Sequence, residues 1–154
     1  MTTERFEVSR EIPVPRETLF TLLRDPAGHV AIDSSGMLQS AEGDPVGQVG
    51  DQFVVHMDRE SLNDYPMGTY DVTIIITAYE PDALIEWTVR GRIRPQLKHL
   101  YGYRLEPTET GTLVTSYYDW SGIDEAYRDK GVFPVIPEAA LRATLGILAR
   151  TVTP

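Results

Sequence analysis

Apolar positions along the chain switch between the alternation typical of strands and the wider spacing typical of helices. Strand-like segments rich in β-branched and aromatic residues follow one another from Gly50 to Trp120. A short helical pattern precedes this run, and a longer one spans Pro137 to Thr151. Because the connections are short, neighbouring strands are expected to be antiparallel. The pattern predicts an α+β fold in which a curved antiparallel sheet of about seven strands wraps around a long C-terminal helix.

Period-two alternation and turn residues predict strands over residues 4–14, 37–41, 52–58, 69–79, 84–90, 98–105 and 112–120. Two short helices are expected after the first strand: Pro15 suits a first helical turn, Asp25-Pro26 ends that helix, and 27–32 form the second. Leu141, Leu145, Leu148 and Val152 give the last helix one apolar stripe. Residues 121–133 are expected to form a loop, either a mobile one that could act as a lid or a fixed, packed one. Without repeats or long linkers, residues 1–154 are expected to form a single domain.

Strand parity predicts which side chains share the face turned toward the helix. A buried Tyr or Trp needs a partner for its polar hydrogen, and water or a ligand in a pocket can supply one. The parity therefore favours a cavity that binds a small hydrophobic molecule, although ordinary cross-strand packing remains the alternative. The expected ligand-binding residues are Phe53, Val55, Met57, Tyr70, Val72, Trp87, His99, Tyr101, Tyr103, Tyr118 and Trp120 on strands, with Leu141 and Leu145 on the last helix.

Composition and charge narrow the possible partners. The net charge of −9 and the isoelectric point near 4.7 argue against binding to nucleic acid or anionic membranes. No apolar run approaches the length of a bilayer span, so stable membrane insertion is not expected. Cysteine is absent, which excludes disulfides and thiolate chemistry, and with no secretory signal at the N-terminus the cytoplasm is the expected compartment. Arg90, Arg92, Arg94 and Lys98 form a basic segment, either a solvated hairpin tip or a cationic rim for a ligand carboxylate or phosphate.

Catalytic motifs are sparse. Metalloprotease and nucleophile-elbow motifs are missing, and three isolated histidines do not have metal-ligand spacing, so no metal or cofactor is expected. The best catalytic hypothesis makes His99 a general acid or base, with Tyr101 and Tyr103 donating hydrogen bonds to a developing enolate. Asp119 is a second candidate acid or base. Packing or surface roles for these side chains remain the alternative.

Short sequence motifs extend this picture to a known family. They are Ile12-Pro13-Val14-Pro15, Asp25-Pro26, Tyr79-Glu80-Pro81 with Ile85-Glu86-Trp87, and the segment 101–107 followed by 111–114. In these the chain resembles the START/Bet v 1-like (SRPBCC) superfamily, and within it the bacterial polyketide cyclase/dehydrase-like group. The resemblance implies the helix-grip fold. It also implies a cavity for lipids, sterols, polyketides or hormones, with a minority of members catalysing ring closure, dehydration or hydrolysis.

Three functions remain open from the sequence. The first is a noncatalytic carrier or sensor of a small hydrophobic molecule. The second is a polyketide cyclase or dehydratase that acts by general acid/base catalysis. The third is a protein-interaction module whose cavity is vestigial. An exposed edge strand also leaves a homodimer open.

Overall fold

The computed structural model describes residues 4–60, 63, 66–92, 94 and 96–153. The chain begins with strand β1 (Arg5–Ile12), followed by helices α1 (Arg16–Leu23) and α2 (Pro26–Ile32). Six more strands follow: β2 (Leu38–Glu42), β3 (Gln52–Asp58), β4 (Thr69–Glu80), β5 (Leu84–Arg90), β6 (Leu100–Pro107) and β7 (Thr112–Asp119). Helices α3 (Glu125–Arg128) and α4 (Glu138–Val152) complete the fold.

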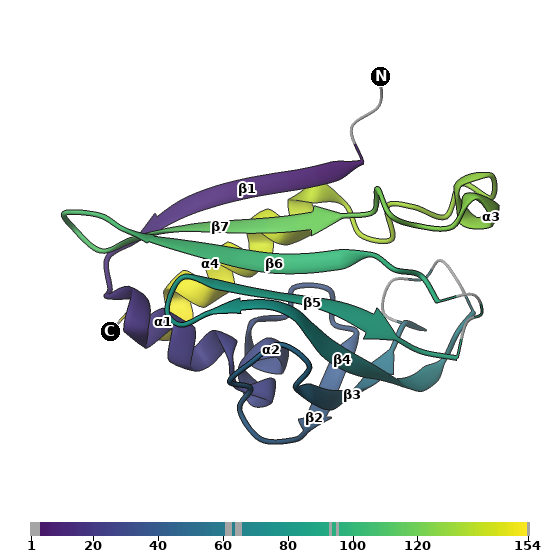
Figure 1. The fold of residues 1–154 in the computed structure, drawn as a ribbon, viewed down its shortest axis with the longest axis horizontal. Helices are drawn as coiled ribbons and strands as arrows, with labels where there is room; N and C mark the ends of the chain where they lie inside the picture. The colour runs from purple at the N-terminus through teal and green to yellow at the C-terminus, as the bar shows by residue number, and fades with distance from the viewer. Residues whose placement is uncertain (1–3, 61–62, 64–65, 93, 95, 154) are drawn as a thin grey trace.

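All seven strands belong to one antiparallel sheet with the order β1-β7-β6-β5-β4-β3-β2. The meander from β2 to β7 follows the chain, and only β1 crosses over to pair with the last strand. Figure 1 shows the curved sheet with α4 running behind β6 and β7, while α1 and α2 cover one end. This arrangement is the helix-grip fold and confirms the predicted fold class.

The apolar stripe of α4 faces the sheet, as its spacing predicted. Leu141, Leu145 and Leu148 are buried, and the helix contacts β1, β7 and α2. Pro137 precedes the first helical residue and Glu138 lies in the first turn, where a carboxylate favours the helix dipole. None of the helices in the described part of the chain combines the length and the apolar composition that crossing a bilayer requires.

The corner between α1 and α2 depends on a glycine. A Cβ atom added to Gly28 would lie 2.0 Å from the carbonyl oxygen of Leu22, a backbone atom of α1. The next residue, His29, binds the carbonyl oxygen of Leu23 in the same turn, with Nε2 at 2.8 Å. The close approach of the two helices therefore holds His29 in place.

We expect Gly28→Ala to lower the free energy of unfolding by about 1–3 kcal/mol, because the backbone must shift to accept the methyl group. Urea unfolding followed by circular dichroism measures this change. Gly146→Ala is the matched control in α4: its Cβ would come no nearer than 3.5 Å to Arg10 Nη1, at the end of a flexible side chain. Helix propensity should make that control neutral or more stable, and an equal loss in both variants would contradict the argument.

Two sequence expectations need correction. Residues 121–133, expected to be a loop, contain the short helix α3, whose Asp124 side chain accepts a hydrogen bond from the Ala126 amide. Arg128 ties this helix to the start of β1 through Glu4, with Nε to Oε2 at 2.8 Å. Strand β6 begins at Leu100 instead of residue 98, because Lys98 has a φ of 57° and cannot continue an extended strand.

Candidate ligand-binding cavity

A cavity of about 640 Å³ lies between the concave face of the sheet and the helices. One wall of the cavity is apolar and is formed by Val55 of β3 and by Val72 and Ile74 of β4. The flexible thioether side chains of Met37 and Met57 also line it. Opposite them, α4 contributes Leu141 and the segment before it contributes Val135 and Ile136. The volume is in the range that binds lipid-like or drug-sized molecules.

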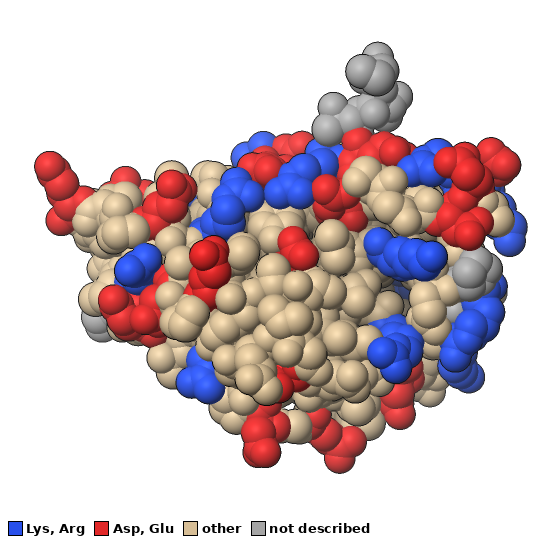
Figure 2. Space-filling view, in the orientation of Figure 1, with Lys and Arg blue, Asp and Glu red and all other residues tan. Residues whose placement is uncertain are grey.

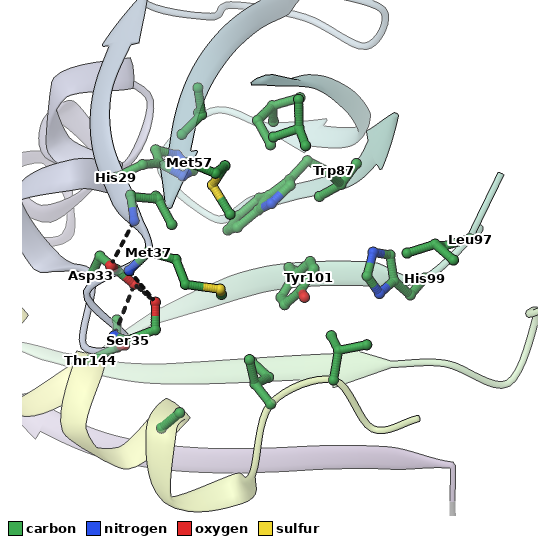
Figure 3. Close-up of a pocket in the computed structure, with 18 of the residues that line it drawn as sticks. His29, Asp33, Ser35, Met37, Met57, Trp87, Leu97, His99, Tyr101 and Thr144 are labelled. Carbon is green, nitrogen blue, oxygen red and sulfur yellow. Dashed lines mark hydrogen bonds between the residues drawn. The ribbon is translucent and has the colours of Figure 1, made fainter. Parts of the chain in front are cut away.

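Polar groups gather at the two ends of this cavity. Figure 3 shows Asp33, Ser35 and Thr144 at one end and His99 with Leu97 at the other, and Trp87, Met57 and Tyr101 lie between them. A ligand that fills the space would thus have an apolar middle and polar contacts at its ends.

The end near α2 is a closed hydrogen-bond network. Asp33 Oδ1 accepts hydrogen bonds from the Ser35 amide at 3.1 Å and hydroxyl at 2.7 Å, and its Oδ2 accepts from the Leu38 amide at 3.2 Å. Ser34 donates to the Ala140 carbonyl at 2.8 Å and accepts from the Thr144 hydroxyl at 2.9 Å. Ser34 and Ser35 lie in the connection from α2 to β2. The structure makes them the link between α2 and α4, with their polar groups already paired within the protein.

An aromatic row crosses three neighbouring strands between the two ends. The strand register pairs Trp87 with Tyr101 and Tyr101 with Tyr118. Their rings are stacked, with centroids 5.9 Å apart in the first pair and 4.5 Å apart in the second. Burial raises the pKa of the Tyr101, Tyr103 and Tyr118 hydroxyls above the ordinary phenol value. These phenols therefore remain neutral and can donate hydrogen bonds at neutral pH.

His99 lies at the edge of this row with only 3% of its surface exposed. Its Nδ1 is 2.8 Å from the Tyr118 hydroxyl oxygen. Its Nε2 is, among the described residues, the one buried side-chain nitrogen or oxygen that has no hydrogen-bond partner. Burial lowers the pKa of His99 to about 4, so the imidazole is neutral at neutral pH.

His29 is a second cavity-lining imidazole, which the sequence did not single out for ligand contact. Its Nε2 donates to the Leu23 carbonyl, because a carbonyl oxygen can only accept. The ring contacts the edges of Phe53 and Trp87, with centroids 5.1 and 4.7 Å away. Burial lowers the pKa of His29 to about 4 as well. It contributes a neutral ring to the wall.

Most of the expected ligand-binding residues line the cavity: Val55, Met57, Tyr70, Val72, Trp87, His99, Tyr101, Tyr103 and Leu141. The structure places the other four outside the lining. Phe53 packs behind His29, and Leu145 lies in the core. Tyr118 lies behind Tyr101, and Trp120 packs against Phe6 at a centroid distance of 4.8 Å.

Asp119 lies apart from the cavity, on the outer face of β7. Its Oδ2 pairs with Arg5 Nη1 at 2.8 Å and its Oδ1 accepts from the Ser121 hydroxyl at 2.6 Å. Partial burial opposes ionisation, but the hydrogen bonds from Ser121 and Arg5 outweigh it and lower the pKa of this carboxyl. A paired, ionised carboxylate on the outer face cannot reach a ligand in the cavity. The structure therefore does not bring Asp119 together with the other candidate residues in the cavity.

The cations that reach the cavity are not those of the basic segment. Arg90, Arg92, Arg94 and Lys98 are absent from the lining, and Arg94 donates to the Gly91 carbonyl at 2.6 Å. The lining instead includes Arg59 and Lys130. Arg59 is buried beside β3, where Nη1 lies 3.7 Å from Met37 Sδ and Nη2 lies 3.4 Å from the Val135 carbonyl. Sequence parity did not identify Arg59, because it follows the last residue of its strand.

The outer face of the sheet differs from the cavity in its polarity. Figure 2, in the orientation of Figure 1, shows acidic and basic side chains gathered around the periphery, while the centre over β4 and β5 is largely uncharged. Toward β1, Tyr117 packs under the Arg5 guanidinium at 4.3 Å and donates to Glu86 at 2.7 Å. On β7 the Tyr117 ring thus packs on the outer face, whereas Tyr118 is buried against Tyr101 on the inner face.

Comparisons with known proteins agree with this geometry. None of the curated proteins matches the chain. Among solved structures, a Chromobacterium violaceum protein has 16% identity, 98% coverage of both chains and a TM-score of 0.68. The ginseng (Panax ginseng) major latex-like protein 151 has 16% identity, 97% coverage of both and a TM-score of 0.65. An AHSA1-like protein from Aeromonas hydrophila has 17% identity over 95% of this chain and 90% of its own, with a TM-score of 0.58. At these identities the likeness concerns the fold.

The family described as polyketide cyclase / dehydrase and lipid transport matches residues 3–153, nearly the whole sequence. The cavity, the curved sheet and the long final helix agree with that match, as does the START/Bet v 1-like resemblance seen in the sequence. The chain belongs to the polyketide cyclase/dehydrase and lipid transport family.

Proposed function

We propose that the protein binds a small, largely hydrophobic molecule inside the sheet–helix cavity. The observation that carries this proposal is the apolar-walled space of about 640 Å³ between α4 and the strands. Filling such a space removes apolar surface of both ligand and wall from water, which is worth roughly 25 cal/mol per Å². The family match supports ligand binding in general terms, and the chemistry of the lining favours a lipid-like or polyketide-like body.

Native mass spectrometry of the purified protein tests the proposal. We expect a retained lipid-like adduct, or uptake of an added apolar probe at one molecule per chain. Trp87 lines the cavity whereas Trp120 lies in the core, so a Trp120→Phe variant leaves one indole that reports on the cavity. Quenching or a spectral shift of Trp87 should accompany uptake. A protein that stays empty and shows no Trp87 response to any apolar probe would overturn the proposal.

A second candidate function is proton-transfer chemistry on a polyketide-like ligand, such as ring closure or dehydration. The observation that favours it is the unpartnered Nε2 of His99, whose ring packs edge-on against the Tyr101 ring at a centroid distance of 5.1 Å. A protein-interaction role with a vestigial cavity is favoured less, because the space is large and its polar ends are ordered. The His99 variant described below also bears on the catalytic candidate.

A further inference from the structure

The Nε2 atom of His99 is buried and has no hydrogen-bond partner among the described residues. A buried polar atom without a hydrogen bond is costly, so native proteins rarely retain one without a reason. In the described part of the chain this happens at one side-chain atom, and that atom belongs to a residue of the cavity lining. In the other lining imidazole, His29, Nε2 donates a hydrogen bond to the Leu23 carbonyl oxygen.

The partner of Nδ1 determines which hydrogen-bonding role is left for Nε2. A neutral imidazole has one N–H donor and one acceptor nitrogen, and the bond made by one nitrogen sets the state of the other. A phenol O–H is a good donor, and an imidazole nitrogen accepts better than a phenol oxygen does. These preferences favour donation from Tyr118, 2.8 Å away, to Nδ1, with the proton on Nε2.

We propose that the ligand carries a carbonyl or carboxylate oxygen that accepts a hydrogen bond from His99 Nε2–H. This inference rests on the proposed function and adds the chemical class of the ligand: an apolar body with an acceptor oxygen at the His99 end. Tyr118 acts as a positioning residue, because it fixes the tautomer without lining the cavity. With its proton on Nε2, His99 is a donor to the ligand oxygen, which fits the acid and not the base of the two roles expected from the sequence.

The surroundings of His99 favour such an oxygen. Arg59 and Lys130 line the same cavity. Burial raises the pKa of the neighbouring Tyr101 hydroxyl, and the positive charge of Arg59 opposes that rise. Asp33, the lining carboxylate, lies at the opposite end (Figure 3). The ring of Phe133 packs edge-on against His99 at 5.5 Å, and Nε2 is closed off from water. The proposal therefore requires the side chains around Nε2 to shift as the ligand oxygen enters.

Three probes with the same twelve-carbon chain test the proposal: dodecane, dodecan-2-one and dodecanoate. Displacement of a fluorescent apolar probe gives their affinities. For the wild-type protein we expect the ketone and the carboxylate to bind about tenfold more tightly than the alkane, as one hydrogen bond to a buried donor predicts. The positive charges should place the carboxylate at or above the ketone.

His99→Phe keeps an aromatic ring of similar size but removes the donor, and it should abolish the preference for the oxygen-bearing probes. His56→Gln is the matched control, since His56 lies outside the cavity, between Asp71 and Glu42. Nitrogen-15 NMR of the histidine rings reads the tautomer without any ligand and should place the His99 proton on Nε2.

Equal binding of all three probes by the wild-type protein, or a preference that survives in His99→Phe, would overturn the inference. A proton found on Nδ1 would overturn it as well. Failure of every probe to bind, the alkane included, would instead defeat the cavity function on which the inference rests. The two failures are therefore distinguishable.

Discussion

Ala140→Trp is expected to weaken ligand binding strongly while the protein stays folded. Ala140 lies on α4 and lines the cavity, so an indole there extends into the space that a ligand would occupy. The void can accept the added atoms, which distinguishes this site from an already filled core. We expect the affinity for apolar probes to fall by about 100-fold, equivalent to about 2.7 kcal/mol. The displacement assay measures affinity, and thermal unfolding checks the fold.

Ala139→Trp is the matched control for this experiment. Ala139 is the preceding residue on the same helix, but it is exposed and is not among the lining residues. The control should bind probes as the wild-type protein does. Unchanged binding by Ala140→Trp, with the fold intact, would mean that ligands do not occupy this cavity. Equal losses in both variants would point to a general effect on α4.

Stability is expected to decrease steeply as the pH falls from about 6.5 to about 4. His29 and His99 are buried and neutral, and burial lowers the pKa of each from 6.5 to about 4. In the unfolded chain both histidines become protonated once the pH falls below their ordinary pKa. In the folded protein they stay neutral until about pH 4, so between these pH values the unfolded state binds protons that the folded state does not. The contribution of each neutral histidine to the free energy of unfolding is therefore fully present above pH 6.5 and is lost as the pH falls toward 4. The loss is about 3 kcal/mol for each histidine.

Urea unfolding at several pH values between 7.5 and 4.5 measures this loss. In His99→Phe one of the two groups is gone, so the pH slope should become shallower by about half of the histidine contribution.

His56 provides a control of opposite sign. Hydrogen bonds to Asp71 and Glu42 raise the pKa of His56, so its contribution is present below pH 6.5 and is lost as the pH rises. A His56→Gln variant should keep the acid loss, and an unchanged slope in His99→Phe would show that His99 does not titrate as described.

Local patterns in the sequence predicted most of the architecture. Alternation located all seven strands within a few residues, and the spacing of Leu141, Leu145 and Leu148 identified the face of α4 that is buried. These features depend on neighbours along the chain, because strand and helix geometry repeat with a fixed period. Prediction was weakest where that period ends. Lys98 with its positive φ and the short helix α3 both lie at such places.

Within the cavity, parity identified residues on the strands but not those supplied by connecting segments. Val55, Val72 and Trp87 were found because alternate residues of a strand face one side. Arg59 and Lys130 follow the ends of their elements, where no periodicity applies. Parity also could not distinguish a side chain that reaches the cavity from one that fills the core behind it, as Tyr118 and Leu145 do.

The amino-acid sequence by itself determined the curved sheet around a long final helix and the apolar character of the inward face, since both follow from the order and spacing of residues. Short motifs added the resemblance to the family and, with it, the helix-grip fold. Tertiary structure decided the chemistry. It brought the Tyr118 hydroxyl to His99 Nδ1 from another strand, joined Ser34 to Thr144 on α4, and turned Asp119 outward toward Arg5. Those contacts depend on the curvature of the sheet and on side-chain rotamers, which are set by packing between elements far apart in the chain.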